Sequence, residues 1–338
     1  MSIIMTGGGT GGHLAIIRAV KEKFDKDIDL VYIGSNRGQD KQWFENDEDF
    51  KARYFLDSKG VVNQKGLGKF VSLWIMFKSV LKARKLLKKH NAKVVFSVGG
   101  FSAAPTAIAA LSLRIPLVIH EQNASMGSLN KLLKPYAKKF ISSYDNTSTQ
   151  IPYPIKDVYF QSARIRTEVK QVIFLGGSQG AKAINDLALN LASMLKQKGI
   201  SIVHQAGEKN VEAVKQAYEK IGVDAKVFGF CKELDRLIAS SDFAIARAGA
   251  STLWELSANG LPTLYIPYPY AASDHQYYNA EFLVKQNLAW VMREKDIEID
   301  CICDIIMTDM SDISKKLIGM VEKNGAQYIA DTLLTFHK

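Results

Sequence analysis

The chain has 338 residues, 47% of them hydrophobic, which is enough for two cores of ordinary domain size. Its three cysteines, Cys231, Cys301 and Cys303, lack metal-ligand spacing, which excludes a disulfide framework and indicates a reducing compartment. No apolar run reaches the roughly 18 residues of a spanning helix and no basic leader opens the chain, so we expect a cytoplasmic protein.

Short apolar strands alternate with helix-forming segments along most of the chain. In the first half we expect strands at residues 2–5, 30–33, 94–98, 117–120 and 140–142, and helices that start at His13, Leu73, Ala103 and Ser128. In the second half we expect strands at residues 172–175, 202–205, 226–228, 243–246 and 263–266, and helices that start at Ala181, Val211, Glu233, Thr252 and Gln276. Continuous apolar strands separated by helices predict parallel sheets that are covered on both faces.

This order of elements predicts the α/β class, with two Rossmann-like, doubly wound parallel-sheet domains that face a cleft. Pro152 and Pro154 break regular structure between the two halves. We therefore expect a first domain at residues 1–150, a linker at 151–166 and a second domain at 167–338, whose last helix is free to pack back on the first domain. Ligands of such domains bind at the carboxyl ends of the strands.

Two glycine-rich turns follow apolar strands about half a chain apart. The first turn runs from Gly7 to His13 and the second from Gly176 to Ala181. Only glycine lets the backbone turn sharply off a strand and approach a phosphate or a sugar, with the amides of the next helix directed at it. Two such turns predict an enzyme that brings two substrates together, at least one of which carries phosphate.

The spacing of Gly7, Gly9 and Gly12 also fits a dinucleotide fingerprint, which would make the protein an oxidoreductase. That fingerprint requires an acidic residue at the end of the second strand to hold the ribose. The strand ends near Ile33, and no acidic residue follows before Asp40. The oxidoreductase alternative also leaves the second glycine turn without a use.

The segment from Lys65 to Lys89 concentrates basic and apolar residues without an acidic one, in a chain of net charge +10. Tryptophan, aliphatic residues and lysine at helical spacing are typical of a helix on an anionic membrane surface, where each basic group contributes ~1 kcal/mol. A core-facing helix with a solvated basic face is the simpler alternative. Nucleic acid is a weaker one, because no motif that reads nucleic acid accompanies the segment.

Six motifs in a fixed order carry a resemblance to a known family. They are GGTGGH (8–13), GGFSAAP (99–105), HEQN (120–123), GGSQGA (176–181), RAGAST (247–252) and DHQYYNA (274–280). With these motifs, up to about residue 290, the chain resembles the MurG family, the peripheral membrane glycosyltransferases of peptidoglycan synthesis. The resemblance implies the GT-B glycosyltransferase fold. It also implies inverting transfer of N-acetylglucosamine from UDP-N-acetylglucosamine to the 4-hydroxyl of the muramoyl sugar of undecaprenyl-pyrophosphoryl-muramoyl-pentapeptide (lipid I), which forms lipid II.

His13 is the candidate catalytic base for the attacking hydroxyl, because histidine titrates near neutrality. Capping of the helix and a hydrogen bond to the acceptor pyrophosphate are its alternatives. Ser178, Gln179 and Thr252 lie near helix starts and suit the donor diphosphate, with Arg247 as a nearby positive charge. No Asp-x-Asp motif lies at a predicted strand end, so we expect that donor binding requires no metal.

The resemblance implies that Glu255 binds both ribose hydroxyls, and a capping-box role is the alternative. It assigns uracil recognition to a backbone amide at Cys231, and sugar contacts to the side-chain amides of Asn123 and Gln276. Lys156 stands where the family usually has arginine, so it keeps the charge but loses the two-pronged geometry. The remaining substrate-binding residues that the resemblance implies are Thr10, Gly11, Gly12, Ala250 and Ser251.

The implied partners are UDP-N-acetylglucosamine, lipid I and, through Lys65–Lys89, an anionic surface on the cytoplasmic face of the cell membrane. Proteins of cell-wall synthesis are further candidate partners, and a divalent cation bound with the acceptor pyrophosphate is compatible with the reaction. Two rival functions remain. A UDP-sugar 2-epimerase shares the fold and the donor but needs no lipid acceptor, and a nucleotide-sugar-binding subunit needs no His13. The motifs at 8–13 and 120–123 favour the transferase.

Overall fold

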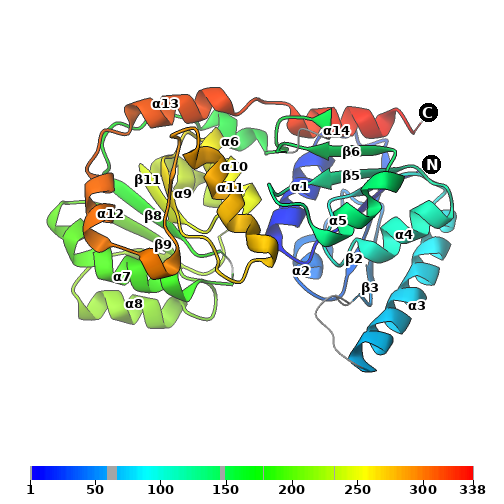
Figure 1. The fold of residues 1–338 in the computed structure, drawn as a ribbon, viewed down its shortest axis with the longest axis horizontal. Helices are drawn as coiled ribbons and strands as arrows, with labels where there is room; N and C mark the ends of the chain where they lie inside the picture. The colour runs from blue at the N-terminus through cyan, green and yellow to red at the C-terminus, as the bar shows by residue number, and fades with distance from the viewer. Residues whose placement is uncertain (1, 59–66, 145–148, 178, 232, 338) are drawn as a thin grey trace. The chain divides into compact units, whose positions relative to one another are not determined.

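The computed structural model describes residues 2–58, 67–144, 149–177, 179–231 and 233–337, which form two compact units (Figure 1). The first unit comprises Met1–Ile155 and Asn324–Lys338, and the second comprises Lys156–Lys323. The division falls inside the expected linker at 151–166. The last helix, α14 (Gly325–Leu334), belongs to the first unit and contacts α1 (Gly11–Lys21), which is the arrangement that the sequence left open.

The first unit is built on a seven-stranded sheet in which all neighbouring strands are parallel. In sheet order the strands are β3 (Ala52–Leu56), β2 (Asp29–Ser35), β1 (Ser2–Thr6), β4 (Ala92–Ser97), β5 (Leu117–Glu121), β6 (Lys139–Ser142) and β7 (Thr149–Gln150). Besides α1 and α14, its helices are α2 (Asp40–Phe44), α3 (Leu67–Lys89), α4 (Ala104–Ser112), α5 (Ser128–Leu133) and a 3-10 turn at Lys134–Tyr136.

The second unit repeats this plan with a six-stranded parallel sheet. In sheet order the strands are β10 (Lys226–Phe228), β9 (Ser201–Gln205), β8 (Gln171–Leu175), β11 (Phe243–Ala246), β12 (Thr263–Tyr265) and β13 (Trp290–Val291). Its helices are α6 (Asp157–Gln161), α7 (Lys182–Gln197), α8 (Val211–Lys220), α9 (Leu234–Ser240), α10 (Ala250–Ala258), α11 (His275–Val284), α12 (Ile299–Ile306) and α13 (Ser311–Met320), with 3-10 turns at Ala272–Asp274 and Glu294–Asp296.

The central strands are buried along their whole length, which explains their continuous apolar sequences. Every strand expected from the sequence is present, with ends that differ by at most two residues. The strands that the sequence analysis missed are β3, β7 and β13, which are short or only partly buried. Three helix starts were wrong by two residues or more, because α1 begins at Gly11, α3 at Leu67 and α10 at Ala250.

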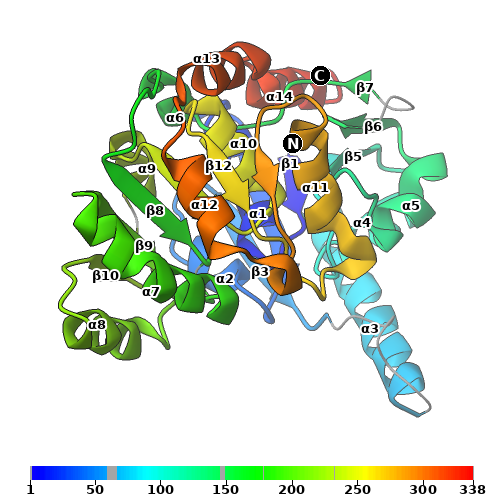
Figure 2. The ribbon, with the colours of Figure 1, turned by 60° about the vertical axis from the view of Figure 1, so that its left-hand side comes forward.

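Helix α3, at the lower right of Figure 2, buries different kinds of side chain along its length. Its second half contributes Ala83 and Leu87 to the core beneath the sheet. Between residues 71 and 81, the part before Ala83 whose side chains the structure describes, the buried side chains are the small Ser72 and Ser79, while large apolar side chains face solvent. The exposed ones are Val71, Leu73, Trp74, Phe77 and Leu81. The core-facing alternative therefore holds for the helix from Ala83 on and not for residues 71–81, and Lys65 lies outside the described residues.

Arg166, at the end of the expected linker, is one of the most buried side chains of the second unit, with 1% of its surface exposed. Its guanidinium donates to the carbonyl oxygens of Arg164 at 2.8 Å and Ser241 at 3.2 Å. It also donates to both the backbone and the side-chain oxygen of Asn259. The residues before β8 therefore belong to the packed interior, because this arginine ties them to the ends of α9 and α10.

Replacing Arg166 by methionine is expected to destabilise the second unit strongly, since it leaves several buried carbonyl oxygens without a donor, at about 1–3 kcal/mol each. Urea unfolding of the variant measures the loss. Arg236→Met is the matched control, because the side chain of Arg236 is 75% exposed. Equal unfolding free energies for the two variants would contradict the structural role of Arg166.

Candidate functional site

His13 lies in the first turn of α1, directly after the first glycine turn. The N-cap of this helix is Thr10, so His13 does not cap it. The Thr10 hydroxyl lies 2.9 Å from Nδ1 of His13, and the side-chain nitrogen of Gln122 lies 3.1 Å from Nε2. A β-carbon on Gly100 would stand 3.6 Å from Cε1 of the ring. Three of the six motifs therefore meet around one imidazole.

The two glycines that open α1 are half-buried, and no acidic residue lies in the first turn of the helix. Gly11 and Gly12 are the first two residues of the helix, where main-chain amides point out of its N-terminal end. The positive end of the helix dipole reinforces them. With Thr10 exposed beside them, this turn can receive an anionic group of a substrate.

A buried carboxylate that the sequence analysis did not assign to the site holds the first glycine turn in shape. Asp40 is completely buried and accepts hydrogen bonds from the amide of Gly9 at 2.6 Å, the amide of Ser35 at 2.9 Å and the hydroxyl of Tyr32 at 3.0 Å. A β-carbon on Gly8 would stand 2.6 Å from this carboxylate. The acid after the second strand therefore supports the turn from behind, which removes the argument for a ribose-binding acid of an oxidoreductase.

Glu121, at the end of β5, organises the loop that carries Asn123. Its carboxylate accepts the amide of Asn123 at 3.0 Å, the amide of Gly127 at 2.9 Å and the side-chain nitrogen of Asn130 at 2.9 Å. Its neighbour His120 is completely buried, and desolvation, with a smaller effect of His13, lowers the pKa of His120 to about 3. His120 is therefore neutral in the folded protein at physiological pH, and Asn123 is half-buried at the rim of the same strand end.

The second glycine turn connects β8 to α7 in the second unit. Gly177 and Gly180 have φ angles of +79° and +77°, and the amide of Gly180 donates to the carbonyl of Gly177 at 2.9 Å. A β-carbon on Gly180 would stand 2.4 Å from the carbonyl of Ala206, so glycine is required at this close approach. Gln179 is exposed on the turn, whereas Ser178 lies outside the described residues.

The first turn of α10 consists of Ala250, Ser251 and Thr252, after an N-cap at Gly249. No acidic residue lies in this turn, so its amides and dipole can receive phosphate. Glu255 lies further along the helix than the third residue, where a capping-box glutamate would stand. The capping alternative for Glu255 is therefore wrong.

Glu255 lies in an environment that disfavours the ionised form of its carboxyl group. Burial raises the pKa of its carboxyl group to about 7, and a hydrogen bond from Tyr159 and the positive charge of Lys156 oppose that rise. The structure thus brings together Lys156, at the N-cap of α6, and Glu255, on α10. The sequence analysis missed Tyr159, because α6 has five residues and no motif marks it.

Arg247 is engaged with the protein rather than directed at the first turn of α10. Its guanidinium donates to Glu294 at 2.5 Å and to the carbonyl oxygens of Ile266 and Pro267 at 3.0 and 3.1 Å. It also lies 5.6 Å from the ring centroid of Tyr268. These contacts tie the end of β12 to the segment after β13, so the predicted contact with the diphosphate needs a different side-chain conformation.

Gln276 lies in the first turn of α11, after a loop with two left-handed residues, Ser273 and Asp274. Its Oε1 accepts the amide of Tyr268 at 3.0 Å. Arg293 secures the loop, since it donates to Asp274 at 2.7 Å and lies 4.0 Å from the centroid of Tyr277. The Gln276 amide is therefore positioned by its hydrogen bond with the Tyr268 amide and by the loop that Arg293 holds in place.

Cys231 is half-buried after β10, next to an exposed Phe230. The amide of Phe230 donates to Glu208 at 2.8 Å, and this contact fixes the turn that precedes Cys231. The predicted contact with uracil is assigned to a main-chain amide, so the thiol has no part in it. The structure places this turn at the carboxyl end of β10, on the same sheet edge as the second glycine turn.

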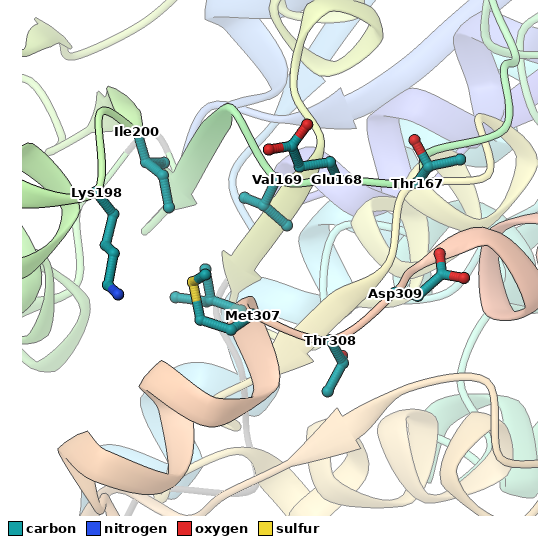
Figure 3. Close-up of a pocket in the computed structure, with 9 residues that line it drawn as sticks. Thr167, Glu168, Val169, Lys198, Ile200, Met307, Thr308 and Asp309 are labelled. Carbon is teal, nitrogen blue, oxygen red and sulfur yellow. The ribbon is translucent and has the colours of Figure 1, made fainter.

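A pocket of about 440 Å³ lies elsewhere in the second unit (Figure 3). Its lining includes Glu168 and Val169 before β8, Lys198 and Ile200 before β9, and Met307 after α12. These residues stand at the amino ends of the strands, opposite the edge where α/β sheets bind ligands. None of the predicted site residues lines this pocket, and we assign it no part in the reaction.

Two family models match this chain, one in each half of the sequence. The model of the glycosyltransferase family 28 N-terminal domain matches residues 3–142, and that of the family 28 C-terminal domain matches residues 171–333. A solved structure of MurG from Acinetobacter baumannii has a TM-score of 0.78 and 26% identity, and the match covers 99% of this chain and 100% of that one. A UDP-GlcNAc 2-epimerase from Neisseria meningitidis, with a TM-score of 0.63 and 13% identity over 99% of this chain and 100% of that one, shares the fold.

Two curated relatives match over essentially their whole length. A protein of Sulfurovum sp. strain NBC37-1 is 62% identical over 100% of both chains, and one of Wolinella succinogenes is 52% identical over 99% of this chain and 100% of its own. Both are named UDP-N-acetylglucosamine--N-acetylmuramyl-(pentapeptide) pyrophosphoryl-undecaprenol N-acetylglucosamine transferase. The chain therefore belongs to glycosyltransferase family 28, and within that family to the MurG group.

Proposed function

We propose that the protein transfers N-acetylglucosamine from UDP-N-acetylglucosamine to the 4-hydroxyl of the muramoyl sugar of lipid I, with inversion, and so forms lipid II. The observation that carries this proposal is the 62% identity, over the whole of both chains, to a relative named for this transfer. The site supports it. The first unit has His13 directly after the first glycine turn, and the second unit has the half-buried Glu255 on α10, whose first turn contains no acidic residue.

Incubation of the protein with UDP-N-acetylglucosamine and a short-chain lipid acceptor tests the proposal, with product mass and UDP release measured together. We expect one UDP for each acceptor that gains an N-acetylglucosamine. An epimerase would act on the donor without the acceptor, and a binding subunit would release no UDP. Either of these results would contradict the transferase.

In the proposed reaction His13 accepts the proton of the attacking hydroxyl while the bond between the sugar and UDP breaks. The charge that develops on UDP would be met by the first turn of α10, with Ala250, Ser251 and Thr252, and by the cation of Lys156. Glu255 would hold the ribose hydroxyls. Donor binding by these groups requires no metal, and a divalent cation would accompany only the acceptor pyrophosphate.

We also propose that the protein acts as a peripheral protein at the cytoplasmic face of the cell membrane, where lipid I and proteins of cell-wall synthesis would be its partners. Within the described residues no helix is long and apolar enough to cross a bilayer. Helix α3 supports surface binding, because Trp74 and Phe77 are 59% and 53% exposed and Lys78 lies 5.2 Å from the Trp74 ring. An apolar surface next to lysines matches an anionic headgroup layer.

Replacing His13 by alanine is expected to lower kcat by about a hundredfold or more, since a general base contributes roughly 10²- to 10⁴-fold. The acidic limb of the pH profile should disappear, while donor affinity changes little. Steady-state kinetics with a water-soluble acceptor, together with calorimetry for the donor, measure both effects. Retention of turnover and of the acidic limb would remove His13 as the base.

Donor binding is expected to weaken as the pH falls below about 7, because protonated Glu255 no longer accepts two hydrogen bonds from the ribose. The dissociation constant of UDP-N-acetylglucosamine should rise by up to about tenfold per pH unit. Folding stability should move the other way. The pKa in the folded chain lies above the usual 4.5, so the folded state binds more protons and unliganded stability falls as pH rises from 4.5 to about 7.

Glu255→Gln should remove both of these pH dependences and raise the dissociation constant at pH 8. Calorimetry between pH 5 and 8 measures the dissociation constant of the donor, and urea unfolding over the same range measures the stability. Glu233→Gln is the control, because the side chain of Glu233 is 64% exposed. A donor affinity that stays constant with pH in the parent protein would contradict the role of Glu255.

Replacing both Trp74 and Phe77 by serine should reduce sedimentation with anionic vesicles and leave turnover of a water-soluble acceptor nearly unchanged, because both side chains face solvent. Lys82→Glu combined with Lys85→Glu should do the same through charge. Met307→Ser, which removes a 56% exposed apolar side chain from the second unit, is the control. Equal vesicle binding by all variants would refute membrane binding by α3.

A further inference from the structure

The side chain of Gln122 lies against His13 and is 6% exposed, directly after β5. Its Nε2 lies 3.1 Å from Nε2 of His13 and 3.3 Å from Nδ1. Its Oε1 is buried and has no hydrogen-bond partner among the described residues. Among the described residues, the side-chain amide of Gln122 is therefore oriented by its contact with His13.

The two nearly equal distances define how the amide and the ring lie. The two nitrogens of an imidazole point in diverging directions within the ring plane. One atom cannot lie along both directions and stay equally close to both nitrogens, so the Gln122 nitrogen lies over a face of the His13 ring. This contact does not occupy the in-plane direction along which either nitrogen exchanges a proton.

Two other contacts restrain the same ring. The Thr10 hydroxyl lies 2.9 Å from Nδ1, and the Gly100 backbone borders Cε1. A side chain at Gly100 would collide with the carbonyl of Gly8, at 2.5 Å, so the turn after β4 that carries Gly100 approaches the first glycine turn as closely as it can. The amide of Gln122 adds the restraint perpendicular to the ring plane, which neither of the others supplies.

The amide contact also affects the charge of the ring. An N–H group carries the positive end of the amide dipole, and over a ring face it interacts favourably with neutral imidazole and unfavourably with imidazolium. The other titratable groups on the neighbouring loops and strand end are His120, Glu121 and Asp40. His120 is buried and neutral, and the two carboxylates each accept three hydrogen bonds from groups other than His13.

We propose that Gln122 is a positioning residue for His13, whose amide lies across one face of the imidazole, fixes the plane of the ring and favours the neutral form that accepts a proton. The inference rests on the proposed function, because His13 matters to catalysis only as the base. The contact itself can be measured without any substrate, so the two claims can fail separately.

Nuclear magnetic resonance titration of the full chain with isotope-labelled histidine tests the contact, and His13→Asn identifies the signal among the 6 histidines. Gln122→Glu should raise the pKa of His13 by about one unit or more, since a carboxylate close to the ring stabilises imidazolium. Gln122→Met, which removes the dipole and keeps the volume, should raise it by less. Gln150→Glu adds the same charge at an exposed position of β7 and should leave the pKa of His13 unchanged.

Kinetics of the same variants with a water-soluble acceptor test the consequence for the reaction. The acidic limb of kcat/KM should move with the titration of His13 in Gln122→Glu. In Gln122→Met, kcat should fall with little change in the donor KM. If the pKa of His13 is the same in the parent and both Gln122 variants, the inference is overturned. If the pKa moves and the acidic limb stays, Gln122 still positions the ring but His13 is not the base.

Discussion

Two buried carboxylates hold the turns at the carboxyl edge of the first sheet, and the site depends on them. Asp40 and Glu121 each accept three hydrogen bonds, mostly from backbone amides of the loops that carry the motifs. Hydrogen bonds of this kind compensate for the desolvation of a buried charge. The bonds to Asp40 hold the first glycine turn, and the bonds to Glu121 hold the loop of Asn123. The ring of His13 and this loop are therefore positioned before a substrate arrives.

The second unit balances stability against binding at Glu255. A carboxyl group with a pKa of about 7 is held in a place that favours its neutral form, at a cost to stability when it is ionised. Tyr159 and Lys156 reduce that cost without removing it. A ribose that offers two hydroxyl donors would compensate for it in the complex, so the free energy stored in the unliganded protein would be recovered on donor binding. The contrast with Arg166, whose donors are all used within the protein, separates a binding group from a structural one.

The strands, the parallel sheets and the motif loops could be predicted, because buried apolar runs and glycine turns are local signals. The contacts between motifs could not. Asp40 stands 31 residues from Gly9, and Gln122 stands 109 residues from His13, so no local pattern links them. For Arg247 the motif predicts a phosphate contact, whereas its guanidinium pairs with Glu294, 47 residues along the chain, which no local pattern indicates. The position of Ser178 stays a prediction.

The proposed reaction is a one-step displacement at the donor sugar by the 4-hydroxyl of the acceptor, with a single base. Nuclear magnetic resonance of the product formed on a short-chain lipid acceptor gives its anomeric configuration and its linkage position, and so tests this reaction. We expect the α-linked sugar of the donor to become β-linked to the 4-hydroxyl of the muramoyl residue. A product with retained configuration, or with the sugar on another hydroxyl, would contradict it.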